Sequence, residues 1–366
     1  MRSVLFVTPV EVDRPVDGLR WRAHLTARAL ASVADLRVLE VTTDGGRPAG
    51  RVVHTPRTPL RRIVSRIHPR LPARVAARDW RAAIAALEQI ERVDLVWVMQ
   101  PDLVGAGVPL PPGRLVVDLV DLEDGKYRGS SMAERLQRRR WRDLQAAVVG
   151  RADAVVVSHP GDAASIQHHR VDVLPNAVDV SAVVQQSDRP TLTLVGRFTY
   201  QPNLEAARWF VDAVWPTISR ARPDARLLLV GRHDGALDGV ARVDGVEAPG
   251  FVEDLEAIWQ GSTALIAPIR TGTGTRLKII EAFAREVPVV STTLGCDGLA
   301  VEAERELLIA DSADDFAAAC LRLLDDADLR AALRMRAAEL AREHHSPDAV
   351  ERVVRTVVDS VMDERS

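Results

Sequence analysis

Short apolar runs recur along the chain and alternate with longer segments whose apolar residues follow helical spacing. A run of about four to eight residues that is apolar on both faces is typical of a buried parallel strand. In the first half of the chain such strands are predicted at 4–7, 36–41, 95–99, 115–119, 154–157 and 171–174. In the second half they are predicted at 191–195, 226–230, 243–248, 264–269 and 289–291. Strands that alternate with helices predict an α/β fold built on parallel sheets.

Helical spacing of apolar residues fills most of the intervals between these strands. Helices are predicted at 22–31, 134–150, 162–168, 206–218, 254–259, 316–324, 329–343 and 347–362, with one more that starts at Thr275 or Arg276. The polar residues 181–190 interrupt the alternation and are typical of a linker. The 366 residues are therefore predicted to form two Rossmann-like domains, 1–180 and 191–345, followed by a C-terminal segment, 346–366.

A glycine loop between a predicted strand and a predicted helix carries the most suggestive chemistry. It runs from Arg270 to Lys278 as R-T-G-T-G-T-R-L-K, and Glu281 follows about one helical turn later. Glycines let a backbone approach a ligand closely, and the free N–H groups at a helix start favour an anion. Arg276 and Lys278 at the helix start and three threonines of the loop add donors. On these residues alone, a diphosphate-binding loop and an ordinary strand–loop–helix unit with solvated charges both fit.

Four motifs, in order along about half of the chain, resemble those of the group 1 (family 4) retaining glycosyltransferases. They are L-P-N-A-V-D at 174–179, V-G-R with P-N at 195–203, P-G-F-V-E-D-L at 249–255, and the loop G-T-R-L-K-x-x-E-A at 274–282, which P-V-V-S-T follows. The resemblance implies a GT-B fold, in which two Rossmann-like domains face each other across a cleft and a C-terminal helix crosses back to the first domain. It also implies sugar transfer from a nucleotide diphosphate sugar, with retention and without a metal or other cofactor.

The resemblance assigns donor-site roles to residues of the second domain. Arg197 and Lys278 are expected to neutralise the diphosphate during catalysis, Glu281 to bind the ribose, and backbone groups around Val252 to meet the base. The donor-binding residues it implies are Gly196, Arg197, Val252, Gly272, Thr273, Gly274, Thr275, Arg276, Leu277, Lys278 and Glu281.

On the acceptor side the resemblance carries over only in part. Gly18 lies in the predicted loop after the first strand, where the family has an acceptor- and phosphate-contacting loop that often holds two glycines. Asp118 and Asp121 follow the strand at 115–119, where the family has a short Asp-rich motif that commonly includes a histidine. No histidine occurs here, so Asp121 is the acceptor-side catalytic candidate, with Asp118 as the alternative.

Two further departures affect the donor side. Asn203 stands where the family has a lysine, and Lys278 is the residue able to supply the missing charge. Thr273 stands where many members have a glutamate that contacts the donor sugar. These departures leave open a non-catalytic nucleotide-binding partner of a transferase, and a nucleotide-sugar epimerase on the same fold is the other alternative. The acceptor itself is not identified and includes a glycan precursor, a glycolipid or a small natural product.

Composition limits which ligands and which cellular compartment the sequence predicts. The net charge of −3 lacks the basic surplus that is typical of nucleic-acid-binding proteins. Cys296 and Cys320 are isolated, which suits a reducing compartment and offers no metal-ligand spacing. No run approaches the ~20 apolar residues that span a bilayer, and the N-terminus reads as a strand rather than a signal peptide. These features predict a cytoplasmic protein without a metal site.

One segment has the pattern of a membrane-surface helix. Between Arg57 and Arg81 lie eight arginines and a single acidic residue, Asp79, and apolar residues run at near-helical spacing through its first half. Basic amphipathic segments lie on anionic membranes, but a solvated helix in an arginine-rich protein gives the same pattern. A second basic cluster, at 135–142, favours peripheral membrane contact.

Overall fold

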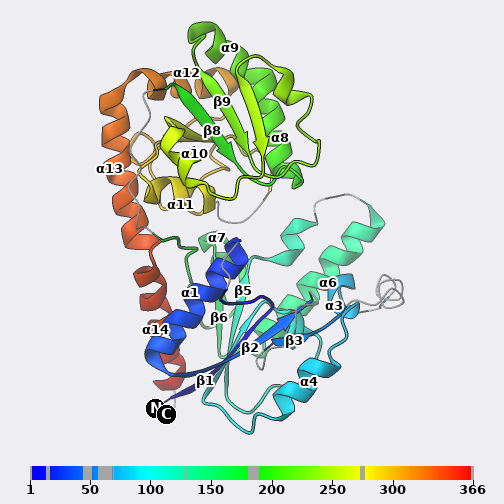
Figure 1. Cartoon of the computed structure of the whole chain (residues 1–366). Coiled ribbons are helices and arrows are strands. Elements are labelled where there is room, and N and C mark those ends of the chain that lie inside the picture. Colours follow the sequence, from blue (N-terminus) through cyan, green and yellow to red (C-terminus); the bar gives the residue numbers. More distant parts are fainter. Residues whose placement is uncertain are drawn as a thin grey trace. The chain divides into compact units, whose positions relative to one another are not determined.

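The computed structural model describes residues 2–13, 17–43, 52–56, 68, 70–127, 129, 131–179, 189–272 and 277–363. The chain forms two compact units, each built on a parallel sheet (Figure 1). The first unit comprises Met1–Asn176 and Pro347–Ser366, and the second comprises Ala177–Ser346. The chain therefore changes unit twice, after Asn176 and again after Ser346. Most of the predicted linker, 181–188, lies outside the described residues.

The first unit holds seven parallel strands in the order β3-β2-β1-β4-β5-β6-β7. The strands are β1 Ser3–Thr8, β2 Asp35–Thr42, β3 Val52–His54, β4 Leu95–Met99, β5 Arg114–Val120, β6 Ala154–Val157 and β7 Val171–Val173. Its helices are α1 Gly18–Val33, α3 Ala73–Ala76, α4 Arg81–Glu88, α5 Asp102–Gly105, η1 Glu123–Lys126, α6 Met132–Val149, α7 Pro160–Ser165 and α14 Pro347–Asp363. The apolar strands β4 and β6 are buried throughout, because helices cover both faces of a parallel sheet.

The last helix, α14, packs beside α1 of the same unit (Figure 1). Its buried side chains include Val350, Val354, Val357 and Val361, spaced three and four residues apart on one face. Ser32 at the end of α1 donates a 3.0 Å hydrogen bond to Glu351, and Arg2 pairs with Asp359. The valine stripe explains why this segment belongs to the first unit although it follows the second in sequence.

The second unit holds six parallel strands in the order β10-β9-β8-β11-β12-β13. The strands are β8 Thr191–Val195, β9 Arg226–Val230, β10 Val246–Gly250, β11 Ala264–Ala267, β12 Val289–Ser291 and β13 Leu308–Ile309. Its helices are α8 Gln201–Trp209, η2 Phe210–Val214, α9 Trp215–Ala221, η3 Val240–Arg242, α10 Glu256–Gly261, α11 Leu277–Ala284, α12 Ala313–Asp325 and α13 Ala327–His344. The α/β class predicted from the alternating runs is confirmed in both units.

Two helices begin four or five residues earlier than their apolar periodicity predicts. The helix α1 starts at Gly18 rather than Arg22, because the side chain of Asp17 accepts the backbone N–H of Arg20 at 2.9 Å and caps it. Gly18 is therefore the first helical residue and not part of a loop. The helix predicted at 206–218 extends over 201–221 as α8, η2 and α9. The wider π turn of η2 lies just before Pro216, which has no N–H to donate.

Candidate functional site

The glycine loop lies at the topological switch point of the second sheet. The strands β8 and β11 are hydrogen-bonded neighbours, although β9 and β10 come between them in sequence. The chain leaves two such strands in opposite directions, and ligands of α/β proteins bind at their carboxyl ends. Gly196 and Arg197 follow β8, whereas Arg270, Thr271 and Gly272 follow β11 shortly after it ends. The topology thus brings two of the sequence motifs to one place.

Lys278 on α11 reaches the end of β8. Its Nζ donates to Oδ1 of Asn203 at 3.0 Å, and the Nδ2 of Asn203 donates to the carbonyl of Arg197 at 3.0 Å. A Cβ built on Gly196 would lie 3.1 Å from this Nζ and 2.9 Å from Asn203 Nδ2. Glycine at position 196 therefore leaves the space that the Lys278 ammonium and the Asn203 amide occupy.

Arg197 contributes a second positive charge at the same strand end. Its side chain is exposed, and among the described residues its guanidinium has neither an ion pair nor a hydrogen bond. The Lys278 ammonium lies beside Gly196, the residue that precedes Arg197 and follows β8.

Gly231 was not among the residues predicted from sequence. It packs against the backbone of Gly196, just after β8. It follows β9 in the same register as Gly196 follows β8, because Val195 pairs with Val230. Its φ is +136°, and a Cβ there would lie 2.0 Å from the carbonyl oxygen of Gly196. Its N–H donates to Gly250 at the end of β10 at 2.9 Å. A glycine directly after each of two buried strands is the sequence signal for this close contact between the two backbones.

The loop after β10 carries Val252, the residue predicted to stand beside the base. Val252 is half-buried, whereas the preceding Phe251 is 76% exposed. Tyr200, which follows β8, is 42% exposed. Aromatic side chains of this kind present flat apolar faces, which favour stacking with planar groups.

The first half of the glycine loop is fixed to α8. The Oγ1 of Thr271 donates to Oε2 of Glu205 at 2.7 Å, and the guanidinium of Arg270 lies 4.8 Å from the centre of the Trp209 ring. The hydrogen bonds from Thr271 and Gln201 lower the pKa of Glu205. Gly272 follows with φ +104°, a conformation that favours glycine. The predicted donor residues Thr273, Gly274, Thr275 and Arg276 lie outside the described residues.

Glu281 lies three residues beyond Lys278 on α11 and is half-buried. Burial raises the pKa of its carboxyl group, and the nearby charges of Arg285 and Lys278 oppose that rise. No hydrogen bond to this carboxylate is found within the described part of the chain. A partly desolvated acceptor of this kind suits a ligand hydroxyl. Leu277, which the resemblance also placed in the site, begins α11 and is half-buried.

Replacing Glu281 with glutamine is expected to raise the thermal stability of the free protein at pH 8. A pKa raised by folding means that the native state binds the proton more tightly, so the charged carboxylate lowers stability at neutral pH. This cost shrinks as the pH falls through the folded-state pKa. The difference in melting temperature between Glu281→Gln and wild type should therefore vanish near pH 4, about the unfolded value. Calorimetry from pH 4 to pH 8 measures it, and a constant difference would contradict the assignment.

On the acceptor side, Asp118 is not available to an acceptor. Its side chain is 0% exposed, and Arg22 donates to both carboxylate oxygens at 3.0 Å. Arg22, itself buried, also donates to the carbonyl of Leu174 at 2.7 Å. The interpretation of Asp118 as an acceptor ligand is therefore corrected: it joins α1 to the end of β5. No pattern along the sequence indicated that Arg22 is buried.

Asp121 lies nearer the surface, after β5. It is half-buried and accepts a 3.1 Å hydrogen bond from Oγ of Ser158, which follows β6. The charge of Asp121 adds to the raised pKa of Asp162, which is mainly due to burial. Just before it, Val120 has φ +64°, an unfavourable conformation for a β-branched residue. Strain of this kind is held in place by its surroundings and is frequent at functional sites.

Two arginines of the segment predicted to contact a membrane point inward. Arg74 donates to Asp102 at 2.6 and 3.1 Å and lies over the Trp141 ring, and Arg78 is 5% exposed. These two side chains thus have partners within the protein, while 57–67 and 69 lie outside the described residues. None of the described helices is long and apolar enough to cross a membrane. The described residues also contain no group of three or more His, Cys, Asp or Glu side chains placed to hold a metal ion.

Residues 189–326, which include the switch point, match the family described as glycosyl transferases group 1. Two curated proteins are also similar. One is an uncharacterized 44.6 kDa protein in the cps region of Klebsiella pneumoniae, 28% identical over 127 residues, which are 32% of each chain. The other is the exopolysaccharide phosphotransferase SCO2592 of Streptomyces coelicolor, 24% identical over 238 residues, which are 60% of this chain and 24% of that protein. The match thus spans a third or less of either relative's length.

Solved structures share the whole architecture. Sucrose-phosphate synthase from Thermosynechococcus elongatus matches with a TM-score of 0.75 and 19% identity, covering 98% of this chain and 99% of that one. HepE of Anabaena, solved in complex with UDP-glucose, matches with a TM-score of 0.67 and 14% identity, covering 98% and 100%. At these identities the likeness establishes the fold, which is GT-B, as the sequence resemblance implied.

Proposed function

We propose that this protein, for which the family match and the GT-B fold support a group 1 glycosyltransferase, moves a sugar from a nucleotide diphosphate sugar to an acceptor with retention at the anomeric carbon. The observation that carries the proposal is the pair of cations at the end of β8. The Lys278 ammonium lies beside Gly196, and Arg197 is the next residue of the chain, at the switch point where ligands of parallel sheets bind.

The leaving group of this reaction is a nucleoside diphosphate, whose negative charge grows as the glycosidic bond breaks. Fixed positive groups that face this charge lower the barrier, because they need no reorganisation in the transition state. We assign this role to Arg197 and Lys278 and propose that they act without a metal ion. Glu281, whose carboxylate has no hydrogen-bond donor among the described residues, is assigned to the ribose hydroxyls.

In this proposal the acceptor binds to residues of the first unit. Asp121 is the candidate that orients the acceptor hydroxyl, since Asp118 is enclosed by Arg22. The acceptor classes that remain are a glycan precursor, a glycolipid and a small natural product. HepE, which shares the fold, was solved with UDP-glucose, and this makes a UDP-sugar the first donor to test.

A thermal-shift panel with UDP, GDP, ADP and dTDP and their sugar nucleotides tests the donor site. A ligand at 100 times its dissociation constant should add about 2.7 kcal/mol of stability to the native state. One nucleotide class is expected to stabilise the wild type, and Arg197→Ala to lose most of that shift. Arg220→Ala, which removes an exposed arginine from α9, is the matched control. A panel in which no nucleotide stabilises the protein would contradict the proposal.

Product analysis then separates transfer from the alternatives. With the stabilising donor and a mixture of acceptors, NMR of the anomeric proton is expected to show the donor configuration kept in the product. Conversion of the donor alone to its epimer would instead indicate an epimerase. Nucleotide binding with neither product would favour a non-catalytic partner of a transferase.

A further inference from the structure

The helix α8 contacts the glycine loop at the point where the loop begins. The Oγ1 of Thr271 donates to Oε2 of Glu205 at 2.7 Å, and the ring of Trp209 lies 4.8 Å from the guanidinium of Arg270. Glu205 and Trp209 are four residues apart, so they share one face of α8. This face therefore contacts the first two residues of the loop, one through a hydrogen bond and the other through an aromatic ring.

The carboxylate of Glu205 is oriented by a second donor. Its Oε1 accepts from Nε2 of Gln201 at 3.0 Å, while its Oε2 accepts from Thr271. Gln201 lies one helical turn before Glu205, on the same face of α8. Both bonds favour the charged carboxylate and lower its pKa, so the acceptor is ionised at neutral pH. A side chain that is already oriented loses less conformational freedom when it holds Thr271.

The same helix also holds the residue at the far end of the loop. Oδ1 of Asn203 accepts from Nζ of Lys278, in the first turn of α11, at 3.0 Å. Gly272, near the other end, has φ +104°, so the chain turns directly after Thr271. Contacts to α8 therefore precede and follow the central part of the loop. Anchoring both ends of a loop lowers the ordering cost that a ligand must overcome.

We propose that Glu205 is a positioning residue of the donor site, and that its bond to Thr271 holds the start of the glycine loop where the loop meets the diphosphate. The inference rests on the proposed function, because it takes the diphosphate as the ligand of this loop. A carboxylate placed against the diphosphate would repel it. Glu205 therefore acts through the neutral hydroxyl of Thr271 and not by contact with the phosphates.

A double-mutant cycle tests this role by calorimetric titration with UDP, GDP, ADP and dTDP. Glu205→Ala and Thr271→Val each remove one end of the bond. Each is expected to weaken binding of the nucleotide that the wild type binds by about three- to tenfold, the range of one net hydrogen bond. Because both changes break the same bond, the double variant is expected to bind no more weakly than the weaker single variant. Effects that multiply would overturn the proposal.

The choice of probes and a conservative variant separate positioning from other roles. These nucleotides lack the sugar, so a loss of their affinity is not due to a contact between Glu205 and the sugar. Glu205→Gln keeps an oxygen that can accept from Thr271 and is expected to bind with nearly wild-type affinity. In transfer kinetics, Glu205→Ala should raise KM for the donor and leave kcat nearly unchanged, because the bound substrate and the transition state need the same loop position.

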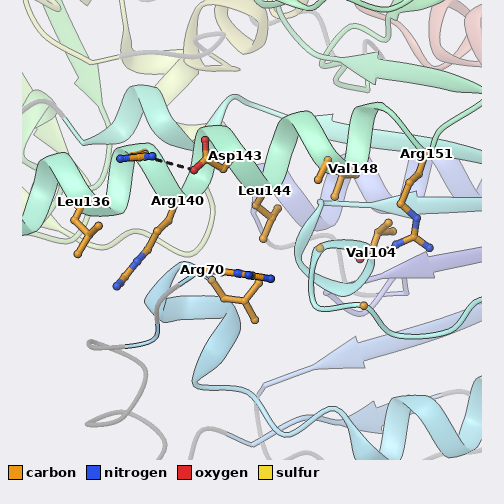
Figure 2. A pocket seen from close by; sticks show the side chains of 13 residues that line it. Arg70, Val104, Leu136, Arg140, Asp143, Leu144, Val148 and Arg151 are labelled. Atoms are coloured by element: carbon orange, nitrogen blue, oxygen red, sulfur yellow. Dashed lines mark hydrogen bonds and ion pairs between the residues drawn. The ribbon is translucent and has the colours of Figure 1, made fainter.

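Asp143→Ala is the matched control. Asp143 is also an exposed carboxylate with a side-chain partner, Arg139 at 3.7 Å, but it lies on α6 of the first unit (Figure 2). It is expected to bind the nucleotide like the wild type, and thermal melting verifies that each variant is folded. Wild-type affinity in folded Glu205→Ala would overturn the positioning role and leave the donor site intact. A wild type that binds none of the four nucleotides would contradict the proposed function, and the positioning role with it.

Discussion

Lys278→Ala is expected to slow sugar transfer by about 10- to 150-fold, which corresponds to the loss of one charge-assisted hydrogen bond of about 1.5–3 kcal/mol in the transition state. In the free protein, the Lys278 ammonium donates to Asn203 and lies beside Gly196. An anion that arrives at the switch point would meet this ammonium without a change in the fold. The loss should appear mainly in kcat, because the charge on the diphosphate is largest in the transition state.

A second substitution makes this test specific. Oδ1 of Asn203 lies 3.0 Å from the Lys278 Nζ, so a lysine at position 203 would carry its ammonium into the same region. In the Lys278→Ala background, Asn203→Lys is therefore expected to restore part of the lost rate. In the wild type, the same change would crowd two ammonium groups and is expected to lower the rate. Steady-state kinetics with saturating acceptor measure all three variants, and wild-type turnover by Lys278→Ala would refute the role.

The places of the donor-site candidates in the fold were predictable because these residues are close in sequence to elements with strong signals. Gly196 and Arg197 directly follow a clear apolar run, and Lys278 lies in the first turn of a helix that follows two glycines. Parallel topology then brings the ends of β8 and β11 together, which sequence alone anticipates for any doubly wound sheet. Gly231 was not predicted, because only its spatial neighbour requires a glycine there. A Cβ at this position would lie 2.0 Å from the carbonyl oxygen of Gly196, and no local sequence pattern indicates that distance.

The acceptor side was harder to predict because its polar residues find partners far along the chain. Arg22 and Asp118 are 96 residues apart, and each alone is typical of a solvated position. Arg74 likewise pairs with Asp102 and Glu123, so part of a segment that looked like a surface helix packs inward. Charge patterns along a sequence cannot distinguish an exposed arginine from one whose partner is brought to it by folding. Asp121, by contrast, stays near the surface.

Asp118→Asn is expected to destabilise the first unit by about 3–5 kcal/mol, because it leaves the Arg22 charge buried without its partner. The two side chains are 0% and 3% exposed, so water cannot replace the lost carboxylate. The Asp118 carboxylate also accepts the N–H of Val120 at 2.9 Å and so holds the strained backbone that leads to Asp121. The loss of stability should therefore extend from β5 to Asp121, the acceptor-side candidate.

Hydrogen exchange of peptides that cover 114–120, in urea, measures this loss within the first unit and leaves the second unit as an internal reference. Arg22→Met combined with Asp118→Leu removes both charges and is expected to recover much of the stability, because apolar pairs often replace buried ion pairs. Asp121→Asn is the matched control: its half-buried carboxylate should leave stability nearly unchanged while transfer slows. A stable Asp118→Asn that nevertheless loses transfer would return Asp118 to the acceptor site and would show that Arg22 can be accommodated without it.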